Sequence, residues 1–238
     1  MIGTVAIALV ALAPQSQDID SYVQKAFKDA TLSAKAAFYS QKELSKINDD
    51  FGKSYRLAND NTQIRVKEPF KLRVDAKVED TKILFVVNGT SSLIRIPGRN
   101  INVRQSLAKS PGRRQTLLDF GIITPSLFND LFEAKFVRLD RATGDVVFDV
   151  TYPKVLDDTS RHRIWIDTEK KYVTKREWYN QPGRQLATFY YMDPQNVGGV
   201  WLPTRTQVKN VDGILAGETR YSGLKVNTGL DDTLFSTK

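Results

Sequence analysis

The stretch Pro69–Ser92, PFKLRVDAKVEDTKILFVVNGTSS, carries the strongest secondary-structure signal in this chain. Its first half places an apolar side chain at every second position: Phe70, Leu72, Val74, Ala76 and Val78. A period of two is typical of a β-strand with one buried and one wet face. A second apolar run, Ile83–Val87, leads into the turn signal Asn88-Gly89. The stretch therefore predicts long antiparallel strands joined by tight turns, and one face of their sheet needs a cover.

The composition excludes several classes of site. The 238 residues are 41% hydrophobic and 26% charged, as in an ordinary globular protein, and the net charge of +8 favours anionic partners. The chain has no cysteine, which excludes disulfides and thiolate metal sites, and its one histidine excludes a histidine-rich metal site. We therefore expect no metal and no cofactor.

The chain begins with an apolar, uncharged segment, Ile2–Ala13. It is shorter than the roughly 20 residues that span a bilayer, and it is similar to the core of a secretory signal. We expect residues 1–17 to be a signal segment, with a buried N-terminal strand as the alternative. No cysteine follows it, so a lipid anchor is not expected. The mature protein is then exported and soluble.

Residues 18–238 are predicted to form one domain made mainly of strands. Apolar residues from Ile19 to Ala30 recur at helical spacing and predict a first helix. Asp18, just before them, is a residue type that can cap its N-terminus. Turn signals recur about every ten residues in the second half, as in a sandwich or barrel. Besides the opening hairpin, the predicted strands are 33–40, 55–66, 93–96, 135–140, 145–152, 161–167, 172–179, 184–192, 199–210 and 214–226.

Two helices are predicted between these runs of strands. Arg113–Phe120 indicates a short helix closed by Gly121, and Thr124-Pro125 begins a second one. The insertion is rich in large apolar side chains: Phe120, Ile122, Leu127, Phe128, Leu131 and Phe132. It is either a plain cap over the core or a lid over an apolar cavity, and periodicity does not separate the two.

The segment Thr81–Leu118 contains no acidic residue. This basic segment is either a solvated surface or a dock for an anionic membrane or an acidic partner. The residues expected to form such a dock are Arg95, Arg99, Arg104, Lys109, Arg113 and Arg114.

No catalytic constellation is visible. The chain lacks a nucleophile elbow, a P-loop and a dinucleotide fingerprint. His162 has acidic and serine neighbours in sequence, yet we interpret it as a surface or strand-edge histidine. Asp231-Asp232 is interpreted as a solvated pair. No nucleic-acid-binding signature appears, so neither an enzyme nor a nucleic-acid partner is expected.

The pattern resembles the LolA-like outer-membrane lipoprotein-sorting proteins of the bacterial periplasm. The resemblance rests on the exported start, Val66-Lys67-Glu68-Pro69, the hairpin ending at Asn88-Gly89, the helical insertion, Ile164–Asp167 and the ending through Asp231 to Phe235. It implies a curved antiparallel sheet forming a half-open β-barrel. The N-terminal helix and the mid-chain helical lid would cover the concave face of this mainly β (α+β) fold.

The resemblance also implies a function. A periplasmic carrier would hold the acyl chains of lipoproteins or other lipids between sheet and lid, and it would meet membrane-embedded donor and acceptor proteins. We expect a monomer. The lid side would be the insertion's apolar residues, and the sheet side would be Phe70, Leu72, Val74 and Phe85. The family's carrier ties its lid with an arginine immediately before the proline, a place that Glu68 takes here.

Two functions follow from this sequence. A carrier requires a cavity large enough for an acyl chain, which favours apolar walls because each buried CH₂ contributes about 0.8 kcal/mol. The alternative is an envelope sensor or scaffold of the same fold, with a filled interior, that binds a protein through the basic segment.

Overall fold

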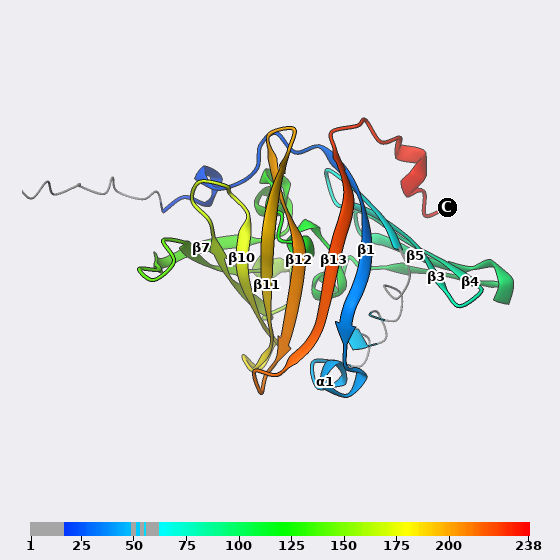
Figure 1. The fold of residues 1–238 in the computed structure, drawn as a ribbon, viewed down its shortest axis with the longest axis horizontal. Helices are drawn as coiled ribbons and strands as arrows, with labels where there is room; N and C mark the ends of the chain where they lie inside the picture. The colour runs from blue at the N-terminus through cyan, green and yellow to red at the C-terminus, as the bar shows by residue number, and fades with distance from the viewer. Residues whose placement is uncertain (1–16, 49–50, 53–54, 56–61) are drawn as a thin grey trace, which may run out of the picture.

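The structure, a computed structural model, describes residues 17–48, 51–52, 55 and 62–238. The strands of this part of the chain form one antiparallel sheet of 13 strands, in the order β6-β5-β4-β3-β2-β1-β13-β12-β11-β10-β9-β8-β7. The first strand pairs with the second and with the last, so it lies at the centre of the sheet. Strands β6 and β7 end the order, and the curved sheet remains an unclosed barrel (Figure 1).

The predicted strands are confirmed in type, with bounds shifted by a few residues. The strands are β1 Asp29–Tyr39, β2 Thr62–Lys67, β3 Lys71–Val78, β4 Thr81–Asn88, β5 Ser91–Ile96, β6 Ile101–Ser106, β7 Glu133–Leu139, β8 Val146–Thr151, β9 Arg161–Ile166, β10 Val173–Tyr179, β11 Gln185–Val197, β12 Val200–Asn210 and β13 Leu215–Val226. The expected strand over residues 55–66 lies partly outside the described residues, and the expected signal segment lies outside them except for Gln17.

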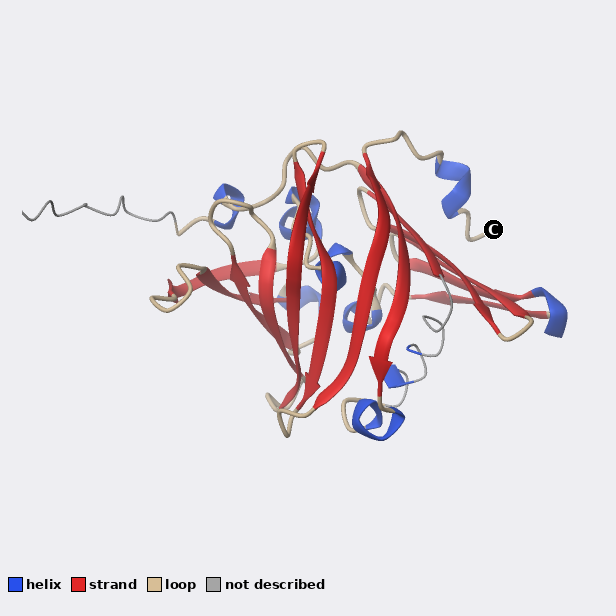
Figure 2. Ribbon diagram, viewed as in Figure 1, coloured by secondary structure: helices blue, strands red, loops and turns tan. Residues whose placement is uncertain are grey.

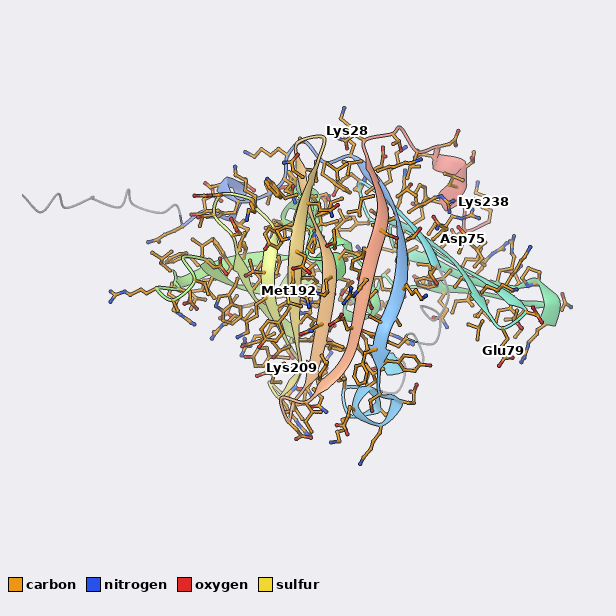
Figure 3. All side chains as sticks on the ribbon, in the orientation of Figure 1. Lys28, Asp75, Glu79, Met192, Lys209 and Lys238 are labelled. Atoms are coloured by element: carbon orange, nitrogen blue, oxygen red, sulfur yellow. The ribbon has the colours of Figure 1, made fainter. Side chains whose placement is uncertain are left out.

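Strands β3–β6 form an arm that extends away from the long central strands (Figure 1). The alternation that predicted its first hairpin is real: Leu72 pairs with Val87 and Val74 with Phe85 across β3 and β4. Gly89 turns the chain at a φ of 58°, as the Asn-Gly signal predicts. Figure 3 shows Glu79, in the β3–β4 turn, at the far end of this arm.

The helical elements are short, and several of them lie behind the long strands, on the concave side (Figure 2). They are η1 Ile19–Ser21, α1 Gln41–Ser45, η3 Pro97–Arg99, η4 Pro111–Arg113, η5 Leu117–Phe120, α3 Pro125–Asp130, η6 Lys154–Leu156 and η7 Asp232–Phe235. The main core joins inner side chains of the sheet, such as Phe148 and Ile164, to cover residues such as Ile122 and Leu127.

The predicted N-terminal helix is wrong. Only the single 3-10 turn η1 forms, capped by Asp18, and β1 takes the chain from Asp29 onward. Tertiary hydrogen bonds replace helical ones: the Gln24 amide both donates to the Trp201 carbonyl and accepts from its N–H, at 2.8 and 2.7 Å. The apolar residues that suggested a helix, such as Val23 and Phe27, are buried as irregular chain.

The C-terminal residues pack on the outer face of the arm. Phe235 is fully buried against Val86 and Leu93 in a small second core. Asp231 caps η7, and Asp232 bridges Lys67 and Lys71 at 2.7 and 2.9 Å. Both residues are exposed, as predicted for a solvated pair, and Asp232 in addition joins the C-terminal segment to the two lysines of the arm.

Candidate functional site

The cover of the concave face is residues 111–132, comprising η4, η5 and α3. The predicted helix over 113–120 is wrong in extent: two separate 3-10 turns form, with Arg114 extended between them. Gly121 ends η5 with a φ of 74°, and Pro125 begins α3 after Thr124, as predicted. Of the lid residues predicted from sequence, the fully buried ones are Ile122, Leu127, Leu131 and Phe132, while Phe120 and Phe128 are half-buried against the same core.

Polar contacts also join this cover to the sheet. The Arg176 guanidinium on β10 forms an ion pair with the Asp119 carboxylate on η5 at 2.8 Å. The Tyr191 hydroxyl donates to the carbonyl of Leu118 at 3.1 Å, and burial raises the pKa of that hydroxyl. The cover therefore rests on a small number of polar contacts inside a larger apolar contact area.

Glu68 contacts the cover. Its carboxylate accepts a hydrogen bond from the Ser126 hydroxyl in the first turn of α3. The other carboxylate oxygen, Oε1, is buried and has no partner among the described residues. The acid at the predicted latch position therefore contacts the helical cover.

The sheet-side residues continue into a longer apolar row. Register places Ile64, Val74, Phe85, Ile94 and Val103 opposite one another across β2–β6, and paired residues share a face. Exposure rises along this inner row from the buried Ile64 through the half-buried Val74 and Phe85 to 39% at Ile94 and 43% at Val103. Five neighbouring strands span roughly 19 Å of sheet.

Ile94, Ile101 and Val103 were not among the predicted site residues. Their signal was present, because apolar and polar residues alternate over 94–96 and 101–104. Strand β6 itself, wholly exposed at the edge of the sheet, was not predicted. The basic residues within these stretches, such as Arg95 and Arg104, are equally typical of an exposed loop, so the short alternation alone does not establish a strand.

Two small cavities lie between the cover and the sheet, each of about 10 Å³. One is lined by Val66, Phe70, Leu72, Leu117 and Leu127, beside the buried end of the inner row, and the other by residues that include Phe120 and Ile122. Ligand pockets usually measure about 300–1,000 Å³. Neither of these two voids among the described residues is the preformed cavity expected of a carrier, since each is near the size of one water molecule. This agrees better with the filled interior expected of the scaffold alternative.

The basic residues do not share one environment. Arg99 and Arg104 lie exposed on the arm, and Arg95 is half-buried on the same arm. Lys109 lies exposed just before the cover, and Arg113 lies exposed within it. Arg114 is half-buried instead, with its guanidinium 5.4 Å from the centre of the Phe70 ring.

His162 is not a surface residue. It is buried on β9, edge-on to Phe132 at 6.0 Å between ring centres, and its Nδ1 has no partner among the described residues. Burial, and to a smaller extent the charge of Arg176, holds the pKa of His162 well below its usual value. Within the same described ranges, no group of three or more potential metal ligands is found.

Comparisons with solved structures bear on the fold. A LolA superfamily protein from Nitrosomonas europaea aligns with 92% of this chain and 94% of its own, with a TM-score of 0.56 and 15% identity. An outer membrane lipoprotein-sorting protein domain from Vibrio parahaemolyticus aligns with 92% of this chain and 93% of its own, at 0.61 and 12%. A DUF1329 family protein from Desulfovibrio piger covers 92% of each chain, at 0.56 and 13%.

Sequence comparisons add little to this. A family model described as an uncharacterized protein matches residues 133–238, and a search of curated proteins finds no match. No helix within the described residues is long and apolar enough to cross a bilayer. The structural likeness and the 13-stranded unclosed sheet confirm the resemblance at the level of architecture: the protein has the LolA-like half-open barrel fold.

Proposed function

We propose that the protein is a carrier of acyl-chain cargo in the bacterial periplasm, as a single exported domain over residues 18–238. The observation that carries this proposal is the inner row, which runs from buried core to exposed apolar surface on the concave side of the arm. An acyl chain laid along this row would leave water without needing hydrogen bonds. Apolar burial contributes roughly 25 cal/mol per Å², so contact along the row supplies most of the binding free energy.

In this proposal, the small size of the two cavities requires the cover to move before cargo is fully bound. Because the two cavities hold about 10 Å³ each, cargo cannot enter fully until the cover moves. The first contact is then made on the exposed end of the row at Ile94 and Val103, and the cargo comes to occupy the whole row as far as Phe70 and Leu72 when residues 111–132 lift. Donor and acceptor proteins in the membrane would govern that movement.

A binding titration tests the proposal. The double variant Ile94→Asp/Val103→Asp places two charges on the row at exposed positions, so the fold is expected to remain intact. We expect it to weaken binding of a fluorescent acyl probe at least tenfold. The matched control is Val211→Asp/Ile214→Asp, which adds the same charges at apolar residues exposed to a similar degree in the β12–β13 turn. If both variants bind the acyl probe equally well, the inner row is not part of the binding site.

A second candidate, an envelope scaffold that binds a protein, is favoured by a different observation. Strand β6 lies at the edge of the sheet with all six residues exposed, and Arg99 and Arg104 make no ion pair with any described residue. An acidic partner strand could pair with this edge. Under this candidate, Arg99→Glu/Arg104→Glu would abolish capture of an envelope protein while leaving acyl-probe binding unchanged.

A further inference from the structure

We propose that the cargo is an anionic amphiphile whose carboxylate or phosphate head binds the guanidinium of Arg114, where the cover meets the sheet at Phe70. This inference rests on the proposed function, because it assigns the head group of the same acyl-chain cargo. It also moves Arg114 from the outer docking surface, where its place in the basic segment suggested it, to the inner site.

The first observation is that Arg114 has no counter-ion in the part of the chain that the structure describes. Its Nε is fully buried without a hydrogen-bond partner, and its guanidinium makes no ion pair with any described residue. Burial accordingly lowers the pKa of Arg114. A partly buried cation without a partner is costly, so an anion placed beside it is bound more strongly than the same anion on the surface.

The second observation is the position of Arg114 relative to the inner row. Its guanidinium lies over Phe70, and Phe70 lines the cavity with Leu72, Gln115 and Thr116. Gln115 and Thr116 follow Arg114 directly in the chain. A cargo molecule with its tail along the row and its end at Phe70 therefore brings its head group to Arg114.

Two carboxylates near this region, Asp119 and Asp158, are bonded to groups other than Arg114. The Asp119 carboxylate already bonds Arg176 and the Thr116 N–H, at 2.8 and 2.9 Å. The Asp158 carboxylate accepts from the N–H and hydroxyl of Ser160, at 2.9 and 2.6 Å, and from the Gly112 N–H. Asp119 and Asp158 lie close enough to Tyr152 to raise its pKa, and Arg114 lies close enough to lower it. Neither carboxylate bonds the Arg114 side chain.

Three probes of equal chain length test this inference on the purified full chain: decanoate, decyl phosphate and decanol, titrated by calorimetry. We expect the wild-type protein to bind at least one charged probe about 10- to 100-fold more tightly than decanol. Arg114→Gln should reduce binding of that charged probe to the level of decanol and leave decanol unchanged. Preference for decanoate would identify a fatty-acid head, and preference for decyl phosphate a phospholipid-type head.

Two further variants separate charge recognition from folding. Arg114→Lys should retain part of the preference for the charged probe, and Arg184→Gln, which removes an exposed charge in the β10–β11 turn, should retain all of it. Equal binding of charged and neutral probes by the wild type would overturn the inference and leave the carrier proposal standing. Equal loss of all three probes in Arg114→Gln would also overturn it, whereas failure of the wild type to bind any probe would contradict the carrier proposal itself.

Discussion

Arg176 and Asp119 join the inner face of the sheet to its cover through an ion pair of 2.8 Å. Arg176 is only 5% exposed, and its guanidinium also lies 4.2 Å from the centre of the Phe189 ring. Asp119→Ala would leave this cation buried and unpaired. We expect the free energy of unfolding, measured in urea, to fall by about 2–4 kcal/mol.

The double variant Asp119→Ala/Arg176→Met provides the control for that prediction. Replacing a buried ion pair by apolar groups is often close to neutral, so the double variant should recover most of the lost stability. A double variant that is less stable than Asp119→Ala alone would show that Arg176 stabilises the fold independently of the carboxylate.

Glu68 and Ser126 form the second connection that we propose as a latch. Ser126→Ala removes the hydroxyl that donates a hydrogen bond to the Glu68 carboxylate. The free energy that favours the closed cover over the open one should fall by about 1 kcal/mol. Hydrogen–deuterium exchange over residues 117–132 should accelerate by roughly fivefold. Ser91→Ala, at an exposed serine on the arm, is the control. Unchanged exchange in the cover of the Ser126 variant would exclude Glu68 as a latch.

The only histidine of the chain predicts a pH dependence. Burial keeps the imidazole of His162 neutral in the folded state, while the unfolded chain binds a proton below a pKa of about 6.5. The unfolded state therefore gains protons first, and stability falls as the pH drops below about 6.5. Between pH 7.5 and 5.5 we expect a loss of about 1.4 kcal/mol in urea denaturation.

His162→Leu should remove that loss, because leucine fills a similar apolar volume and does not titrate. The two proteins would then differ in their pH dependence above about pH 5.5, where carboxylates of ordinary pKa are still ionised. Parallel stability curves for the variant and the wild type would show that His162 becomes protonated without unfolding.

The burial of Phe235 indicates that the C-terminal segment contributes to the stability of the arm. Its fully buried ring packs on Val86 and Leu93, and the Lys67–Asp232 ion pair lies nearby on the same outer face. Phe235→Ala should lower the free energy of unfolding by about 3–5 kcal/mol. A loss below about 1 kcal/mol would indicate that this small core forms independently of the ring.

The sheet was predictable because its signal is local. Alternation from Phe70 to Val78 and the Asn88-Gly89 turn fix two strands without knowledge of the rest of the chain. The segment before β1 was not predictable in the same way. Its helical spacing is real, but tertiary partners such as Trp201, 177 residues away along the chain, take the hydrogen bonds that a helix would need.

The burial of the apolar residues of the candidate site was predictable from sequence, and the placement of its polar residues was less so. Leu127 and Leu131 of the cover lie in the core, as their spacing indicates. The inward position of Arg114, by contrast, depends on the break between η4 and η5, and its sequence neighbours suggest only a basic surface. The pairing of Arg176 with Asp119 joins residues 57 positions apart, which no local pattern encodes.

The most direct test of the account is to purify the protein gently from a bacterial periplasm, extract it with organic solvent and identify the co-purifying molecules by mass spectrometry. The account predicts a stoichiometric acyl-chain molecule with an anionic head, absent from Ile94→Asp/Val103→Asp and retained by Val211→Asp/Ile214→Asp. An empty protein that also fails to bind added acyl probes would contradict the carrier proposal and favour the scaffold, with strand β6 as the place to seek its partner.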